Sequence, residues 1–135
     1  MSKALSLLQP WASLVVIGAK TVETRSWNTD YRGRLLIHAS KGKSGAALAA
    51  EPFLAKYIPR FAELPFGAII GEVMLTEVVR LTELALPPAL LDRLTLEERA
   101  FGAYDTGRYA WLLEDAIQYD HPVPATGALG LWDAG

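Results

Sequence analysis

The spacing of hydrophobic and polar positions divides the first part of the chain into a helix followed by a strand. Residues 5–20, LSLLQPWASLVVIGAK, place apolar side chains on one helical face, and Pro10 falls in the first turn, where a missing N–H costs nothing. Gly18 is typical of the residue that follows a helix. Residues 20–27, KTVETRSW, alternate as β-strands do, so they are predicted to form a strand.

The later part of the chain predicts further strands and short helices, and together they favour an α+β domain on a twisted mixed sheet or small open barrel. In chain order the expected elements are a strand at 34–41, a helix at 42–58 interrupted by Pro52, a long central strand at 66–81, a short helix near 95–98 and strands at 107–115 and 122–133. Gly67 and Gly71 indicate a bulge or a close backbone approach. Thr95 and Glu98 have the spacing of a capping box.

Composition narrows the class of protein. The chain has 135 residues, 51% of them hydrophobic and 21% charged, which suits one domain over residues 1–135 with a true core. It contains no cysteine, which excludes disulfides and cysteine-bound zinc. No apolar run approaches the length of a membrane span, and the N-terminus lacks a signal-peptide core. We therefore expect a soluble, cytoplasmic protein.

Charge is distributed unevenly along the sequence. The formal net charge is -2, but residues 20–43 hold six lysines and arginines against two acidic residues, a balance of +4, so the remainder carries -6. Binding depends on the local electrostatic field rather than on the total charge. A negatively charged partner is therefore expected to bind the basic segment.

Established catalytic signatures are absent from the sequence. It has no phosphate-binding loop, no dinucleotide fingerprint, no zinc-protease motif and no nucleophile elbow. Its only histidines, His38 and His121, lie far apart, so a histidine-rich metal site is not expected. No metal ligands and no cofactor are predicted on this basis.

The charged group in the predicted strand at 20–27 has two interpretations. Glu23, Arg25 and Trp27 are two residues apart and share one face, while Lys20 starts the opposite face at a strand end where it can swing. One interpretation is an exposed pair of charges that contributes ~0–1 kcal/mol and has no function. The other is the floor of a cleft, with Lys20 and Arg25 as anion ligands, Glu23 as an acceptor or general base, and Trp27 as a stacking surface.

Two other polar groups carry similar alternatives. His38, with Ser40 and Lys41, is either a half-buried histidine bonded to the backbone or part of the same polar face, on a strand paired with residues 20–27. Glu72, alone in an apolar run, either points outward from its strand or is a site acid with a raised pKa. The core is expected to contain Trp11, Trp111 and Trp132.

The quoted segments together resemble the ASCH domain family, a branch of the PUA-like superfamily. Gly18, Lys20, Glu23 and Arg25 fill the G-x-K-x-x-E-x-R pattern of that family, and YRGRLLIHASK, GAIIGEVML, GRYAWLLED and GALGLW are similar to its small bacterial single-domain members. The resemblance implies a PUA-like mixed β-barrel of five to six strands with flanking helices. It also implies a cleft between the barrel and the first helix, lined by the motif residues.

The resemblance implies a ligand class as well. PUA-like domains mostly bind RNA or modified bases, so the partner expected is RNA or a modified nucleoside or nucleotide. The ligand-binding residues implied are Lys20, Glu23, Arg25, Trp27, Arg32, His38, Ser40 and Lys41.

Two enzymatic alternatives and one structural alternative accompany the binding function. Some small ASCH proteins are amidohydrolases of N4-acetylcytidine that use a lysine, a threonine and a glutamate, but the position of that threonine is Glu23 here. Other members are ribonucleases, for which a divalent cation is possible. In either enzyme Lys20 and Glu23 would be the catalytic residues. The third alternative is a protein-interaction domain whose acidic half contacts a partner.

Overall fold

The computed structural model describes residues 2–82, 88–95, 98 and 104–134. Its strands are β1 (Lys3–Leu7), β2 (Val22–Arg25), β3 (Gly33–Ala39), β4 (Ala68–Arg80), β5 (Tyr109–Pro124) and β6 (Leu131–Asp133). Its helices are α1 (Trp11–Val16), α2 (Ala46–Ala49), α3 (Pro52–Ala55), α4 (Pro88–Leu91) and the 3-10 turn η1 (Phe61–Glu63). Within the described ranges, none of the helices is long and apolar enough to span a membrane.

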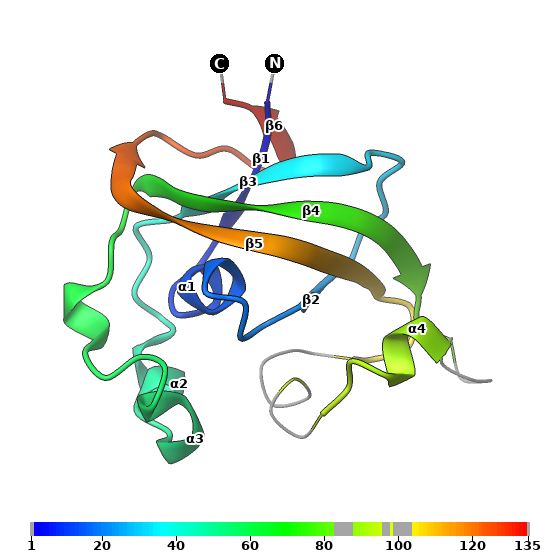
Figure 1. Ribbon diagram of the computed structural model, residues 1–135, viewed down its shortest axis with the longest axis horizontal. Helices are drawn as coiled ribbons and strands as arrows, with labels where there is room; N and C mark the ends of the chain where they lie inside the picture. Colours follow the sequence, from blue (N-terminus) through cyan, green and yellow to red (C-terminus); the bar gives the residue numbers. More distant parts are fainter. Residues whose placement is uncertain (1, 83–87, 96–97, 99–103, 135) are drawn as a thin grey trace.

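The strands form one sheet in the order β2-β5-β4-β3-β1-β6. β1 and β3 are parallel, and the other neighbours are antiparallel. The sheet curls into a half-barrel around α1, with the two chain ends close together beside β1 and β6 (Figure 1). This architecture confirms the predicted α+β, PUA-like fold with a small mixed barrel of six strands.

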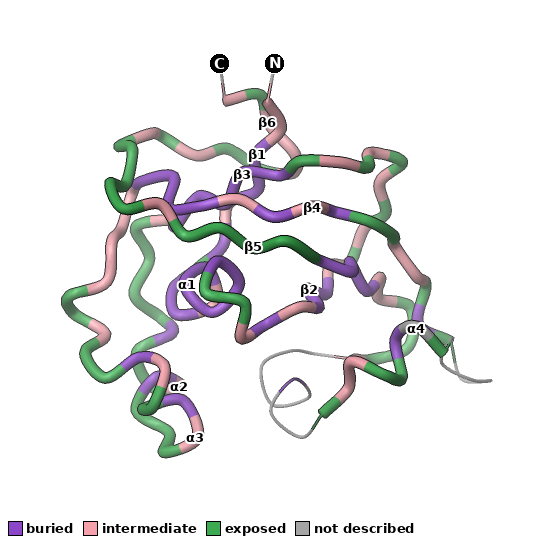
Figure 2. The backbone as a smooth tube through the Cα atoms, in the orientation of Figure 1, coloured by how far each residue is buried: buried purple, intermediate pink, exposed green. Residues whose placement is uncertain are grey.

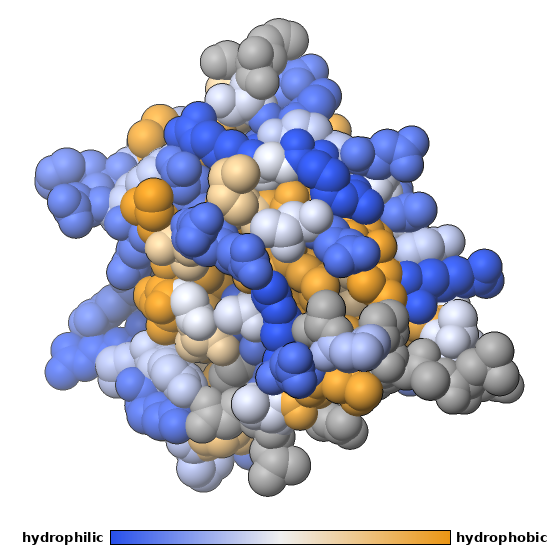
Figure 3. All heavy atoms as spheres, turned by 45° about the vertical axis from the view of Figure 1, so that its right-hand side comes forward, coloured by the Kyte–Doolittle hydropathy of each residue, from blue (hydrophilic) through white to orange (hydrophobic). Residues whose placement is uncertain are grey.

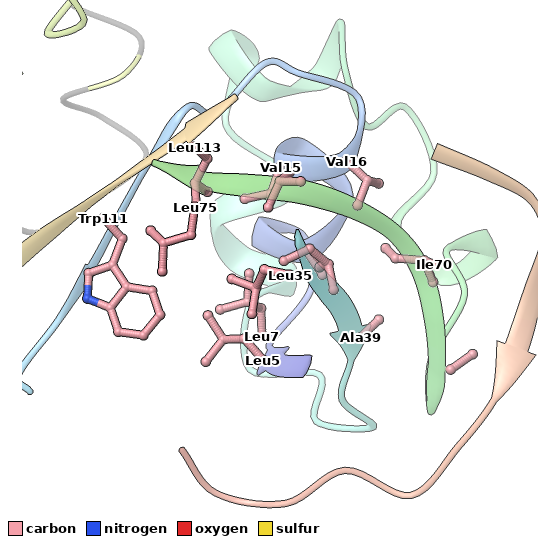
Figure 4. Packing of buried hydrophobic residues seen from close by; sticks show 14 residues of the cluster. Leu5, Leu7, Val15, Val16, Leu35, Ala39, Ile70, Leu75, Trp111 and Leu113 are labelled. Carbon is pink, nitrogen blue, oxygen red and sulfur yellow. The ribbon is translucent and has the colours of Figure 1, made fainter. Parts of the chain in front are cut away.

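The core lies between α1 and the inner face of the sheet. Val15 and Val16 from α1 belong to the same hydrophobic cluster as Leu35 from β3 and Trp111 and Leu113 from β5 (Figure 4). Burial follows this arrangement, because α1 and the inner residues of the strands are buried while the central part of β5 is exposed (Figure 2). On the face shown in Figure 3, hydrophilic side chains separate several small hydrophobic areas.

The N-terminal segment differs from its prediction. Residues 3–7 form strand β1 rather than the first turns of a helix, and α1 begins only at Trp11, with Pro10 immediately before it. An apolar run this short fits either period, and its pairing with β3 and β6 decides the outcome because it lies between them. Trp11 also differs: it is partly exposed and lines a cavity, whereas Trp111 is fully buried in the core as predicted.

The predicted strand at 20–27 is shorter than expected and has a different neighbour. β2 covers only residues 22–25 and pairs with β5, where Glu23 lies opposite Trp111. It does not pair with β3, which lies between β4 and β1. Trp27 therefore lies beyond the end of β2 and does not share a strand face with Glu23 and Arg25.

Other local predictions are confirmed. The helix at 42–58 is interrupted at Pro52, which begins α3 after α2 has ended. Gly71 lies at a bulge between β4 and β5, and a Cβ atom there would come within 2.3 Å of the carbonyl oxygen of Ile117. The backbone N–H of Glu98 donates to Thr95 Oγ1 at 3.1 Å, as in a capping box, while most of that predicted helix lies outside the described residues.

Candidate functional site

A cavity of about 970 Å³ opens between β2 and the loop that connects β5 to β6. Its lining comes from the end of β1, the start of α1, all but the first residue of β2, the end of β3 and residues 125–130. The curl of the sheet explains this gathering, because it turns β2, at one end of the sheet, toward β1 and β6 at the other. Segments that are far apart in the sequence thus form one concavity.

Glu23 is the only acidic side chain in the described lining of the cavity. It is buried, with a tenth of its side chain exposed. Its Oε1 accepts the N–H of Thr24 at 3.0 Å and lies 3.7 Å from Lys20 Nζ, and its Oε2 lies 3.6 Å from Arg25 Nη1. The carboxylate is therefore held between two cations at distances longer than direct hydrogen bonds, so it retains lone pairs for a further donor.

Lys20 lies behind Glu23 rather than in the cavity. Its side chain is completely buried, and Nζ donates to the carbonyl oxygen of Val22. The expectation of a lysine free to swing at a strand end is therefore wrong. In this position the ammonium group compensates the buried charge of Glu23 and orients that carboxylate.

Arg25 lines the cavity, but its aromatic neighbour does not. About a quarter of the Arg25 side chain is exposed, at 27%, and its guanidinium lies 5.8 Å from the ring centroid of Trp27. Trp27 packs edge-on against Trp111 with ring centroids 4.9 Å apart and lies outside the described cavity lining. Arg32 also lies outside it, where its guanidinium donates to the carbonyl oxygens of Thr29 and Tyr31.

Two more cations reach the cavity from other parts of the fold. The methylene chain of Lys41 lies over Gly67, where a Cβ atom would come within 2.9 Å of it. Arg108, which precedes β5, donates from Nη2 to the carbonyl oxygen of Thr24 at 2.9 Å, while its buried Nε has no hydrogen-bond partner among the described residues. Neither Lys41 nor Arg108 forms an ion pair within the described ranges.

His38 supports the wall of the cavity. Nδ1 lies 3.0 Å from Ser6 Oγ, which accepts the indole N–H of Trp132 at 3.1 Å, and Nε2 lies 2.8 Å from the carbonyl oxygen of Ala125. A carbonyl can only accept and an indole N–H can only donate, so the neutral ring carries its proton on Nε2 and accepts the Ser6 hydroxyl at Nδ1. The bond to Ala125 confirms a histidine held by the backbone. Ser40, also in the lining, donates its hydroxyl to the carbonyl oxygen of Leu7.

Glu72 lies outside this site. It points outward from β4 and accepts two hydrogen bonds from Arg34, at 2.9 and 3.0 Å, and one from Tyr119 at 2.7 Å. Hydrogen bonds from Arg34 above all, and from Tyr119, hold the pKa of Glu72 below its usual value. The alternative of a site acid with a raised pKa is therefore wrong, and the outward-facing strand residue is correct.

Glu98 is a second buried carboxylate, and it interacts with the charge of Lys20. Its oxygens accept the backbone N–H groups of Thr21, at 3.1 and 3.2 Å, and of Val22, at 2.9 Å. Burial raises the pKa of Glu98, while these N–H groups and the charge of Lys20 oppose that rise. Lys20 therefore lies under the influence of two buried carboxylates, Glu23 and Glu98.

The structure thus separates the predicted site residues into three groups. Five of them line the cavity: Glu23, Arg25, His38, Ser40 and Lys41. Lys20 supports Glu23 from behind, and Trp27 and Arg32 lie elsewhere. The sequence patterns did not indicate that Trp11, Arg108 and the loop at 125–130 line the cavity, although the two glycines of PATGALG were an available signal for the loop.

The curled six-strand sheet around a short helix, with a cationic cavity beside its edge strand, defines a PUA-like domain. A family model described as "ASCH domain" matches residues 5–122, and the chain belongs to that family. ASCH from Zymomonas mobilis has a similar fold, with a TM-score of 0.55 and 22% identity over 91% of this chain and 73% of that one. A crystal structure of a single-residue variant of that protein aligns with a TM-score of 0.51 and 21% identity over 91% of this chain and 75% of the other.

Two mammalian proteins share a higher identity over shorter segments. Activating signal cointegrator 1 from Homo sapiens is 62% identical over 39 residues, which are 29% of this chain and 7% of that protein. The Mus musculus protein of the same name is 51% identical over 53 residues, or 39% of this chain and 9% of that protein. The matched segments thus span less than a tenth of these relatives.

Proposed function

We propose that the cavity binds RNA, or a nucleotide whose base is modified. The observation that supports this is the charge of its described lining, where Arg25, Lys41 and Arg108 face the single carboxylate of Glu23, a balance of +2 in a chain whose formal charge is -2. Cations concentrated in a concavity attract phosphate, and counterion release makes such binding favourable. The membership of the chain in a family that resembles RNA-binding domains agrees with this charge.

The shape and polarity of the cavity suit a base. Its volume of about 970 Å³ lies within the range of small-molecule sites. Apolar side chains supply part of the wall: Leu7, Leu8, Trp11, Leu48 and Leu129. Single-stranded RNA is bound by stacking of splayed bases on aromatic side chains, a role open to Trp11, together with polar contacts to the base edges. Glu23 and Ser40 supply polar atoms at the same place.

The dependence of binding on salt tests this proposal. We expect the logarithm of the association constant for a short single-stranded RNA to fall with the logarithm of salt concentration with a slope of about -1.4 to -2, as two or three phosphate contacts require. Substituting Lys41→Ala is expected to lower that slope by about 0.7. Arg60→Ala is the matched control, because Arg60 is an exposed cation outside the described lining. A flat plot would contradict the proposal.

A hydrolytic activity on the same ligand class is a second candidate. The observation in its favour is that Thr24 and Glu23 both line the cavity and that Lys20 contacts Glu23, so a hydroxyl-bearing residue, a carboxylate and a lysine are close together. Among the described residues no three His, Cys, Asp or Glu side chains form a metal-binding group. Release of acetate from N4-acetylcytidine, or cleavage of single-stranded RNA with and without Mn²⁺, tests it. Unchanged substrates would contradict it.

A further inference from the structure

The outer edge of β2 is covered by charged side chains. In an antiparallel strand the N–H and the carbonyl of one residue point to the same edge, and those of the next residue point to the opposite edge. In β2 the N–H and carbonyl groups of Val22 and Thr24 point away from β5. The N–H and carbonyl of Val22 bind Glu98 and Lys20, and those of Thr24 bind Glu23 and Arg108. Every outward main-chain group of these two residues thus has a charged side chain as its partner.

The two ends of this edge have different surroundings. Thr24 and both side chains that cover it, Glu23 and Arg108, line the cavity. Val22 is completely buried, as is the side chain of Lys20, and neither belongs to the described lining. Thr24 is itself buried, with 5% of its surface exposed, but it belongs to the lining, so one residue of the edge borders the cavity and the other does not.

We propose that the main chain of Thr24 binds the edge of a base in this cavity, which deepens the proposed function and rests on it. An extended residue holds its N–H donor and its carbonyl acceptor side by side, pointing in one direction. That pair is complementary to a planar ring edge that carries an acceptor next to an N–H. The ligand class is accordingly a nucleobase with adjacent donor and acceptor atoms, held by two hydrogen bonds to one residue.

The partners of Thr24 in this structure are arranged so that a ligand can replace them. Glu23 keeps its two cations, at 3.6 and 3.7 Å, when its carboxylate leaves the N–H of Thr24. Arg108 has a buried Nε without a partner among the described residues, so its present position leaves one donor unsatisfied. Turning outward would free the carbonyl of Thr24 and bring the guanidinium within reach of phosphate.

A single edge residue that borders the cavity also favours a base over a peptide. Addition of a peptide strand uses a run of main-chain groups along a sheet edge. Here Glu98 and Lys20, both buried, occupy the neighbouring position at Val22. A base needs only the pair at Thr24, whereas a peptide strand would have to displace the partners of Val22 as well.

Backbone amide NMR of the ¹⁵N-labelled protein tests the proposal. Each of the four common ribonucleoside 5′-monophosphates is titrated separately, and the amide signals of Thr24 and Val22 are compared. We expect the Thr24 amide to shift and its hydrogen exchange to slow at saturation, with Val22 unchanged as the internal control on the same edge. Shifts at Val22 as well would indicate strand addition and overturn the proposal.

The remaining outcomes separate this proposal from the proposed function. Saturable shifts around Arg25 and Lys41 with an unchanged Thr24 amide would overturn the main-chain contact and leave nucleotide binding intact. No saturable shift with any of the four nucleotides would overturn nucleotide binding in this cavity, and the contact to Thr24 with it.

A variant provides an independent measurement. Thr24→Pro removes the outward N–H without removing a hydrogen bond to β5, because proline is tolerated on edge strands at such positions. We expect it to bind the same nucleotides about tenfold more weakly, the effect of losing one hydrogen bond and leaving its partner unpaired. A variant with an unchanged thermal midpoint and unchanged affinity would overturn the proposal.

Discussion

Glu23 and Glu72 are both strand carboxylates beside an arginine, yet their surroundings are opposite. Glu72 lies on the outer face of the sheet, where Arg34 and Tyr119 donate hydrogen bonds of 2.7 to 3.0 Å to it. Glu23 lies on the edge strand β2 beside the cavity, where Lys20 Nζ and Arg25 Nη1 lie 3.6 to 3.7 Å from its carboxylate oxygens. Glu72 has short hydrogen bonds and a partly exposed side chain, whereas Glu23 has longer contacts and a cavity in front of it.

This difference shows where chemistry is available in the fold. Arg34 and Glu72 on the outer face bond to each other, and a surface ion pair of this kind contributes ~0–1 kcal/mol to stability. The inner group consists of Glu23 with Lys20, Arg25 and Arg108. In it Glu23 keeps free lone pairs, and the Nε of Arg108 has no hydrogen-bond partner among the described residues. Incomplete pairing inside a concavity is costly for an isolated protein and is relieved by a ligand.

The largest expected effect comes from removing the buried cation of the inner group. Lys20→Met leaves Glu23 and Glu98 without their shared neighbour, and breaking a buried ion pair in this way costs about 3–5 kcal/mol. Urea unfolding measures the loss. Lys41→Met, at an exposed cation of the same cavity, is expected to stay within about 0.5 kcal/mol of the original chain.

A double variant identifies the cause of that loss. If unpaired charge is responsible, Lys20→Met combined with Glu23→Gln is expected to recover part of the stability lost in Lys20→Met alone. If Lys20→Met were as stable as the original chain, the ion pair of Glu23 would contribute as little to stability as a surface pair. The contrast drawn between Glu23 and Glu72 would then be wrong.

The next effect concerns binding and compares the two arginines directly. Arg25→Ala is expected to weaken binding of a short single-stranded RNA about tenfold at low salt and to lower the salt slope by about 0.7, because one phosphate contact is lost. Arg34→Ala is expected to leave both quantities unchanged, since Arg34 is bound to Glu72 on the outer face. Fluorescence anisotropy titrations at several salt concentrations provide both values. Equal losses in the two variants would indicate non-specific attraction.

The smallest effects concern pH and have opposite signs for Glu98 and Glu72. Burial raises the pKa of Glu98 above its usual 4.5, so its favourable contribution to stability is complete below about pH 4.5 and is lost as the pH rises through its folded value. The bonds from Arg34 and Tyr119 lower the pKa of Glu72, so its contribution is complete above about pH 4.5 and is lost as the pH falls through its folded value.

Glutamine variants separate these two contributions. The free energy of unfolding of the original chain minus that of Glu98→Gln is expected to decrease as the pH rises from about 4.5, while the difference for Glu72→Gln is expected to decrease as the pH falls below about 4.5. Urea unfolding from about pH 3 to about pH 8 measures both slopes. If both stability differences changed with pH in the same direction, the opposite pKa shifts of Glu98 and Glu72 would be contradicted.

Local patterns in the sequence predicted those elements whose form depends on their own residues. Continuous apolar runs predicted β4, and the alternation around Leu35 and Ile37 predicted β3. Pro52 predicted the break between α2 and α3, since proline restricts the backbone wherever it occurs. Glycine at position 71 likewise predicted the close approach to β5.

The parts that were missed depend on contacts between distant segments. Residues 3–7 form a strand only because β3 and β6 pair with them, and the lining role of Trp11 follows from that shift in where α1 begins. Arg108 lies more than eighty positions from Glu23 and joins it because β2 pairs with β5 rather than with β3.

The order of the amino acids is enough to show which charged residues this protein possesses, that Lys20, Glu23 and Arg25 follow one another in a β-forming segment, and which family the chain resembles. The tertiary structure decided which of those charges is buried and which faces a cavity. The physical reason is that side-chain spacing sets only the relative direction of neighbouring groups, whereas burial and partner choice depend on the curl of the sheet and on its pairing. That pairing turned Lys20 inward as a support, left Glu23 and Arg25 facing open space, and placed Glu72 on the outer face with a complete set of partners.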